Sequence, residues 1–131
     1  MKKKVRSRNP LKTLKNKLWR LCVEITRKKY GNECYTCGHK GLEGKNWHTG
    51  HFLPKKTCGA FLKFDIRNLR PQCYNCNINL GGNGAEFMRK MLIRESQEYV
   101  DQIFRDKQLI TKEKEHYPML YEKYLILLEE L

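Results

Sequence analysis

Two Cys-x-x-Cys pairs constrain this chain more than any other feature of its sequence. Cys34 and Cys37 form the first pair, Cys73 and Cys76 the second, and 35 residues lie between them. Four thiolates in this pattern can close a tetrahedral zinc site of the structural type, whereas a single pair would also suit a redox motif. A short zinc ribbon has a gap of roughly 15 to 20 residues. We therefore expect a folded element between the pairs and predict a β-hairpin.

The strands of this hairpin are predicted at residues 47–53 and 60–68, on either side of a loop rich in chain breakers. Successive side chains of a strand point to opposite faces. Alternation therefore turns His51 away from the core, toward Asp65 and Arg67.

A short helix is predicted at residues 74–80, ended by Gly81 and Gly82. It begins at the second cysteine pair, so zinc would clamp its start and fix the direction of Asn77. A knuckle, a hairpin and then a helix is the treble-clef or ββα-metal arrangement. The predicted fold class is α+β, a small zinc-bound core flanked by N- and C-terminal helices.

We divide the chain into one core with appendages. Residues 1–10 form a basic arm with too little apolar surface to fold alone. Residues 11–31 have apolar positions at helical spacing and predict an amphipathic basic helix. Residues 32–84 form the zinc-bound core. Residues 85–131 form C-terminal helices used for packing or for dimerisation.

Two details are predicted within the C-terminal part. Asn83 and Glu86 have the spacing of a capping box, which predicts one helix from there to about Asp106. The last helix follows from Thr111, and Pro118 either starts it or kinks it.

Charge is distributed unevenly along the chain. The net charge is +13, and residues 1–30 hold 12 Lys and Arg against one acidic residue. Such a basic excess at the front of the chain favours a polyanionic partner, most simply nucleic acid. The candidate DNA-binding residues are Lys2, Lys3, Lys4, Arg6, Arg8, Lys12, Lys15, Lys55, Lys56 and Arg67.

Apolar segments are short, the longest aliphatic block being residues 125–128. A bilayer span needs about 20 apolar residues, so we expect no membrane partner. No apolar run follows the first four residues, so we expect a cytoplasmic protein with reduced thiols. We assign no role to the remaining cysteines, Cys22 and Cys58.

Hydrolysis of a phosphodiester requires a base that deprotonates water and a cation that neutralises the leaving oxygen. His51 is the candidate base and Asn77 a candidate metal ligand, while Asn68 would hydrogen-bond either the backbone or His51. Zinc held by four thiolates offers no open position. A catalytic ion would therefore be a second, harder one, Mg²⁺ or Mn²⁺.

Six ordered motifs stand out in this part of the chain: Cys34-Tyr-Thr-Cys37-Gly38, Trp47-His48-Thr-Gly50-His51-Phe52, Phe64-Asp65, Asn68, Gln72-Cys73-Tyr-Asn-Cys76-Asn77 and Leu80-Gly-Gly82-Asn83. Together they resemble, over about residues 34–104, a phage recombination endonuclease family called NinG or Rap. The resemblance implies a phage-encoded HNH-type nuclease, placed in the host cytoplasm, that cuts Holliday junctions and D-loops. It implies that His51 is the general base, Asn77 a metal ligand and His48 a second active-site histidine. The same pattern is similar to phage endonuclease VII, a zinc-tied dimer.

One position departs from the HNH pattern, in which an Asp or His that binds the metal usually precedes the base. Here that residue is Gly50. His48 and Asp65 are the two candidates for the additional ligand.

Two functions remain open. The first is a metal-dependent, structure-selective DNA endonuclease, and symmetric cutting of a four-way junction would require a homodimer. The alternative is a non-catalytic zinc-stapled DNA-binding protein, which would need the zinc and the basic residues but not His51 or Asn77.

Overall fold

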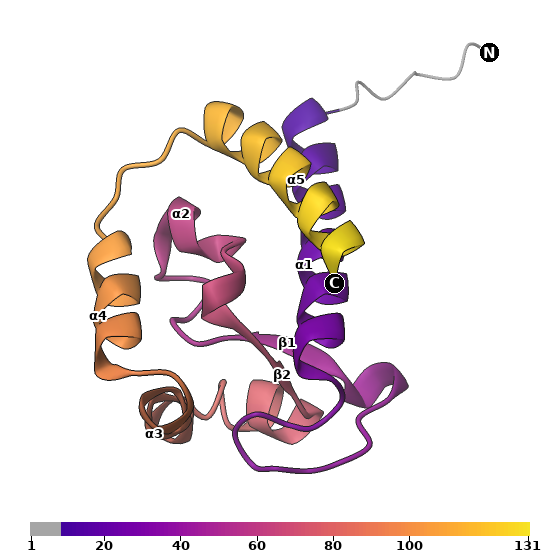
Figure 1. Ribbon diagram of the computed structural model, residues 1–131, viewed down its shortest axis with the longest axis vertical. Helices are drawn as coiled ribbons and strands as arrows, with labels where there is room; N and C mark the ends of the chain where they lie inside the picture. Colours follow the sequence, from indigo (N-terminus) through magenta and orange to yellow (C-terminus); the bar gives the residue numbers. More distant parts are fainter. Residues whose placement is uncertain (1–8) are drawn as a thin grey trace, which may run out of the picture.

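The computed structural model describes residues 9–131 and contains five α-helices around a two-stranded antiparallel sheet (Figure 1). Within these residues no helix is long and apolar enough to cross a bilayer. The mixture of helices with a small sheet confirms the coarse fold class. The elements are α1 (Pro10–Tyr30), β1 (His48–His51), α2 (Gly59–Lys63), β2 (Leu69–Gln72), α3 (Gly84–Arg94), α4 (Gln97–Asp106) and α5 (Glu113–Glu130), with short helical turns at Gly44–Asn46, Ile66–Asn68 and Asn75–Asn79.

The predicted first helix is confirmed as α1, and its ends have the expected chemistry. The Asn9 side chain accepts hydrogen bonds from the amides of Leu11 and Lys12, two of the donors that a helix start leaves free. Pro10 occupies the first helical position, where its missing N–H has no effect. Gly31 follows the last residue with a φ of 72°, a conformation that glycine adopts without strain.

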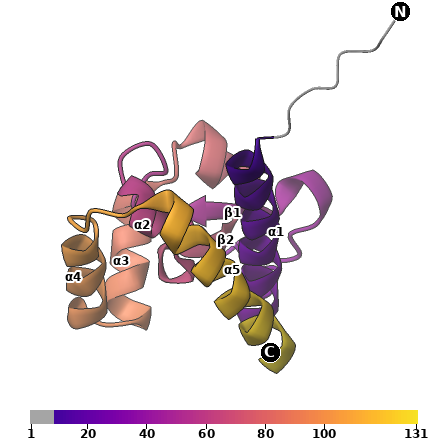
Figure 2. The same ribbon diagram turned by 90° about the horizontal axis from the view of Figure 1, so that it is seen from above.

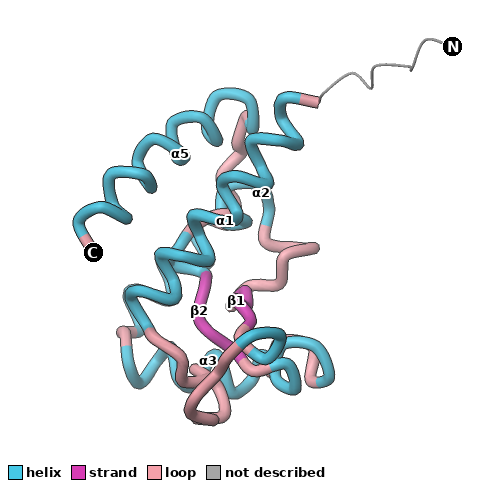
Figure 3. The backbone as a smooth tube through the Cα atoms, turned by 90° about the vertical axis from the view of Figure 1, so that its right-hand side faces the viewer, coloured by secondary structure: helices cyan, strands magenta, loops and turns pink. Residues whose placement is uncertain are grey.

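Helix α5 lies along α1, as Figures 2 and 3 show from two directions. Pro118 is inside α5 rather than at its start. The apolar stripe of α5 thus packs within the chain, while its use as a dimer seam stays untested. The buried side chains of this core are Leu18, Leu21, Cys22, Ile25, Phe64, Leu69, Tyr117, Leu120 and Tyr124.

The second strand of the hairpin was predicted in the wrong place. Residues 60–68 form α2 and a tight turn, and the strand paired with β1 is Leu69–Gln72. The alternating residues 64–67 do not form a strand, because the Asp65 carboxylate accepts the Arg67 amide and caps a turn there. Pro71 argues against a strand in the sequence, yet an edge position opposite Thr49 requires no amide from it.

The single helix predicted from residue 84 to about Asp106 is two helices, α3 and α4. Ser96 separates them, since its hydroxyl accepts the Tyr99 amide at 3.0 Å and caps α4. The predicted capping box is also wrong. Asn83 has a left-handed backbone (φ 51°, ψ 51°), and its side chain caps no helix.

Candidate functional site

The four cysteines of the two pairs come together in the structure. Their sulfur atoms all lie within 4.8 Å of one another, and those of Cys37 and Cys73 are 3.7 Å apart. Zinc–sulfur bonds of about 2.3 Å in a tetrahedron place sulfurs about 3.8 Å apart. The cluster therefore fits a zinc ion, as the sequence predicted.

Polar groups around the cluster are arranged to support negative sulfur. The Thr36 hydroxyl lies 3.4 Å from the Cys34 sulfur, and the Cys76 amide donates to the Cys73 sulfur at 3.4 Å. Burial alone would raise the pKa of the Cys34 thiol, but hydrogen bonds from Cys37, Thr36 and Cys73 outweigh it and lower that pKa to about 6. Burial raises the pKa of Cys37 to about 12 and also raises that of Cys73, so in the metal-free cluster Cys34 is the first of these three to lose its proton. A thiolate is the form of cysteine that binds a metal.

The two remaining cysteines lie outside this cluster. Cys22 is buried in the core beneath α5, and its thiol donates to the carbonyl of Phe64 at 3.4 Å. Cys58 is buried in the core formed by α2, α3 and α4. Both cysteines are therefore core residues and not part of the candidate metal site.

The cysteine cluster positions Asn77 through the backbone. The Asn77 amide donates to the carbonyl of Cys73 at 3.0 Å. The Asn77 side-chain nitrogen lies 2.9 Å from Nδ1 of His48, while Nε2 of His48 lies 2.9 Å from the carbonyl oxygen of Lys45. A carbonyl only accepts hydrogen bonds, so Nε2 carries the proton and Nδ1 is free to accept. His48 and Asn77 therefore form one polar pair.

His51 is held by a similar backbone contact. Its Nε2 lies 2.9 Å from the carbonyl oxygen of Lys63, which again places the proton on Nε2. The indole of Trp19 stacks on the imidazole with the ring centroids 5.4 Å apart and the planes 6° from parallel. Burial lowers the pKa of His51, and the charges of Lys55 and Lys63 lower it further, against the opposing effect of the carbonyl hydrogen bond. The imidazole is neutral at pH 7.

A groove, defined here as three adjoining cavities, connects these side chains. His51 and Asn77 both line the largest, of about 660 Å³. Asn77 also lines the second, of about 320 Å³, together with His48, and His51 also lines the third, of about 210 Å³. Among the residues that line the groove in the described part of the chain, none is Asp or Glu.

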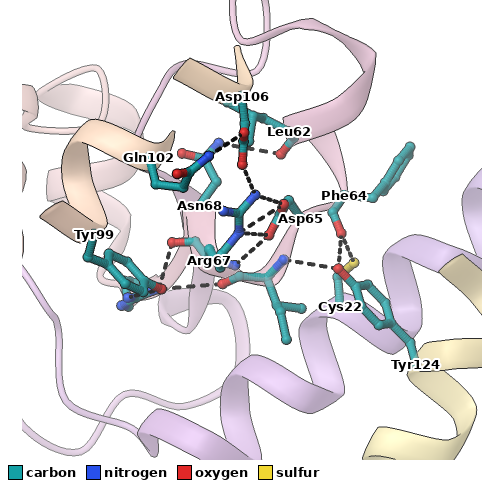
Figure 4. A network of polar contacts seen from close by, with 12 residues as sticks. Cys22, Leu62, Phe64, Asp65, Arg67, Asn68, Tyr99, Gln102, Asp106 and Tyr124 are labelled. Atoms are coloured by element: carbon teal, nitrogen blue, oxygen red, sulfur yellow. Dashed lines mark hydrogen bonds and ion pairs between the residues drawn. The ribbon is translucent and has the colours of Figure 1, made fainter. Parts of the chain in front are cut away.

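The structure does not bring Asp65 or Arg67 into this groove. The Arg67 guanidinium donates to the Asp65 carboxylate at 2.6 Å and to that of Asp106 at 2.7 Å (Figure 4). The expectation that His51 points toward these two residues is therefore wrong, because both belong to the turn that replaced the predicted strand. Asp65 is engaged by an arginine rather than open to a cation, and the charge of Arg67 is compensated by two carboxylates.

Asn68 bonds the backbone and not His51. Its Oδ1 accepts from the Leu53 amide at 2.8 Å, and its Nδ2 donates to the Leu53 carbonyl at 3.1 Å. The side chain is fully buried and lines none of the three cavities. Asn68 thus fixes the chain that follows β1 to the start of β2.

Basic side chains gather at the groove from several elements. Lys12, Lys15 and Lys55 line the third cavity together with His51, and Lys56 lines the largest cavity. Lys15 also pairs with Glu113 at 2.8 Å. The candidates Lys2, Lys3, Lys4, Arg6 and Arg8 lie outside the described residues.

Sequence reasoning proposed Lys12 and Lys15 of α1 as DNA-binding residues but missed the other α1 side chains that line the groove. Trp19 lines all three cavities, and Val23 and Arg27 line the one that contains His48. Lys12, Lys15, Trp19, Val23 and Arg27 recur three or four residues apart, a spacing that places them on one side of a helix. That spacing was visible in the sequence, although nothing in it showed what this side would face.

Comparison with known proteins identifies relatives. The family model described as "Bacteriophage Lambda NinG protein" matches residues 1–131. Over 71 residues the chain is 37% identical to the protein ninG of Escherichia phage 933W and of Enterobacteria phage VT2-Sa, and 35% identical to that of Escherichia phage lambda. Each match covers 53% of this chain and 33% of the relative, so it spans about a third of those proteins. No solved structure shows significant similarity to the chain.

Proposed function

The chain belongs to the NinG family of phage proteins, and from this membership together with the geometry of the groove we propose that it is a metal-dependent DNA endonuclease of the HNH type. The observation that carries the proposal is the way in which the His51 side chain is held beside Asn77. Its neutral imidazole has Nε2 committed to the Lys63 carbonyl and lines the same cavity as Asn77.

His51 is suited to act as a general base through Nδ1. With the proton on Nε2, Nδ1 carries the lone pair that removes a proton from water. The water oxygen forms the new bond to phosphorus while the bond to the leaving oxygen breaks. Burial lowers the pKa of His51 and so favours the neutral imidazole, and the positive charges of Lys55 and Lys63 favour it further.

His48 and Asn77 are the residues that would hold a catalytic Mg²⁺ or Mn²⁺. Their side-chain atoms lie 2.9 Å apart, which is close to the separation of adjacent ligands in an octahedral site with bonds of about 2.1 Å. A 180° rotation of the amide would turn Oδ1 of Asn77 toward the ion. When bound, such an ion would neutralise charge on the leaving oxygen.

DNA would lie in the groove by virtue of charge and shape. Lysines from α1 and from the loop after β1 flank His51, and they would contact phosphates rather than base edges. Selectivity would then come from the shape of the DNA. Branched recombination intermediates such as Holliday junctions and D-loops are the substrates that we propose, with a homodimer for symmetric cutting.

The test compares cleavage with binding on a four-way junction in Mg²⁺ and in Mn²⁺. We expect His51→Ala to abolish nicking while the dissociation constant for the junction changes less than threefold. His39 is exposed and lines no part of the groove, so His39→Ala is the matched control and should cut normally. Wild-type protein that holds zinc and binds junctions, but nicks no branched or linear DNA, would refute the nuclease.

A second experiment tests the groove as the binding surface. Lys12→Ala combined with Lys55→Ala removes two positive charges from the groove. Lys17→Ala combined with Lys28→Ala removes two from exposed positions outside it. We expect the first pair to weaken binding and to reduce the slope of log K against log salt by about 2. Equal effects of both pairs would mean that binding follows net charge and not this groove.

One observation favours the non-catalytic alternative, namely the lack of a carboxylate among the described residues that line the groove. A protein that only binds DNA has no need of His51 in a neutral form, so the cleavage experiment also decides between the two functions.

A further inference from the structure

Trp19 occupies a position that neither the zinc cluster nor the polar pair explains. It belongs to α1, far in sequence from the hairpin, yet its indole stacks on His51 and lines all three cavities of the groove. A core tryptophan would face the apolar cluster between α1 and α5. Trp19 instead only borders that cluster and is partly exposed.

The hydrogen bond of His51 leaves one movement of its ring free, namely tilting of the ring plane. Strand β1 fixes the backbone of His51, and the bond from Nε2 to the Lys63 carbonyl fixes one atom of the ring. A single hydrogen bond still allows the ring plane to tilt about it. A parallel aromatic ring whose centroid lies 5.4 Å from that of the imidazole restricts this tilt.

We propose that Trp19 is the positioning residue for the general base, its indole holding the His51 imidazole in the orientation that presents Nδ1 to the groove. This inference rests on the proposed nuclease function. Trp19 touches His51 and not the reacting atoms, so it acts through the base.

The indole of Trp19 also contacts a second aromatic ring, which limits its own movement. Phe64 meets it edge-on with the ring centroids 6.4 Å apart and the planes at 61°. Phe64 is buried and also packs edge-on against Tyr117 of α5. A continuous line of aromatic contacts thus runs from α5 through the core to His51.

The positive charges near His51 explain why an aromatic ring, and not a carboxylate, is suited to orient its imidazole. Lys12, Lys15, Lys55 and Lys63 line the same cavity as His51, and no acidic residue of the described chain lines it. A carboxylate in place of Trp19 would orient the ring by a hydrogen bond but would also favour its protonated form. An indole face restricts the ring plane without adding a negative charge.

The test replaces the indole while keeping apolar contact with the core. Trp19→Leu removes the stack, and Trp19→Phe retains a smaller aromatic face. A stacked indole shifts the ring-proton resonances of His51 upfield, and these can be assigned by their loss in His51→Ala. We expect Trp19→Leu to move them downfield in the folded, zinc-loaded protein and Trp19→Phe to move them part of the way back.

The kinetic expectation is a selective loss of turnover. Misplacing a reacting group by about 1 Å reduces the rate by about 100-fold. Trp19→Leu should therefore lower kcat by between 10- and 100-fold with KM changed less than threefold, and Trp19→Phe should restore most of kcat.

Unchanged His51 resonances in Trp19→Leu would overturn the proposal. A raised KM with normal kcat would also overturn it and would make Trp19 a contact for a nucleobase. The resonances are measured without DNA, so the stack remains testable if the protein cuts no substrate. In that case the nuclease fails separately from the stacking contact.

Discussion

Gly50 looks from the sequence like a missing metal ligand, but the structure gives a different reason for it. A Cβ built on Gly50 would lie 1.8 Å from Oε1 and 2.7 Å from Cδ of the Gln72 side chain. Gln72 is fully buried, and its Nε2 donates to the Thr36 hydroxyl at 3.2 Å and to the Gly82 carbonyl at 2.9 Å. The amide of Gln72 therefore occupies the space that any side chain at position 50 would need.

These contacts set the effect expected of Gly50→Ala. The backbone of Gly50 does not have the positive φ that favours glycine, so the substitution acts through Gln72 alone. Displacing the amide breaks two hydrogen bonds worth about 1 kcal/mol each, and overpacking a core adds about 1 to 3 kcal/mol. We expect the free energy of unfolding to fall by about 3 to 5 kcal/mol. With a slope of about 2 kcal/mol/M, the urea midpoint should fall by about 1.5 to 2.5 M.

The assay is urea unfolding with saturating zinc, followed by circular dichroism. Gln72→Ala serves as the partner variant, because shortening this side chain clears the space. We expect Gly50→Ala to destabilise the Gln72→Ala protein at least 1 kcal/mol less than it destabilises the wild type. Gly50→Asp should lose stability and gain no metal site. A change below about 0.5 kcal/mol in Gly50→Ala, or strict additivity with Gln72→Ala, would refute the reasoning.

Three further predictions concern the site and its support. Asn68→Ala should lower the free energy of unfolding by about 2 to 4 kcal/mol, because it leaves a buried amide and a buried carbonyl of Leu53 unpaired, whereas the exposed Asn79→Ala should change it by less than about 0.5 kcal/mol. A stable Asn68→Ala protein with no cleavage would instead make Asn68 catalytic. The acid limb of kcat/KM should lie below the ordinary histidine pKa of about 6.5, since burial lowers the pKa of His51 and its neutral form persists to lower pH. A limb above that pH would contradict His51 as the base. Mn²⁺ should support faster cleavage than Mg²⁺, because imidazole and amide donors lack the carboxylate that Mg²⁺ sites use, and His48→Asp should shift the preference toward Mg²⁺. Faster wild-type cleavage with Mg²⁺ would argue against His48 as a ligand.

The sequence predicted correctly those elements whose stabilising interactions all lie within one segment of the chain. The helix from residue 10 to 30 has its cap, its apolar spacing and its terminal glycine all within one segment. The second strand could not be read in this way. Leu69–Gln72 is fully buried and includes Pro71, and it is a strand because β1 pairs with it, which no pattern within the segment shows.

The candidate site shows the same contrast between features predictable from one segment and features set by tertiary contacts. Spacing predicted the cysteine cluster, because four thiolates that are to share one zinc ion must lie close together, and they do. Asp65 was considered as a ligand for its chemical type, but Arg67 and the turn between them engage its carboxylate. Trp19 was overlooked because its role depends on how α1 crosses the hairpin, a tertiary relation set by α5 and the core.

The neutrality of the His48 and Asn77 pair determines the order in which a catalytic ion and DNA would bind. Two uncharged donors add no negative charge to offset the dehydration of a divalent cation, and nearby Lys45 and Arg27 repel it. A phosphate in the groove would supply both oxygen ligands and negative charge. The ion should therefore bind weakly to the free protein and tightly only with DNA, and by linkage DNA should bind more tightly when the ion is present. If the proposed function holds, the groove would attract DNA first through its lysines and would become competent for cleavage only where a phosphate lies beside His48 and Asn77.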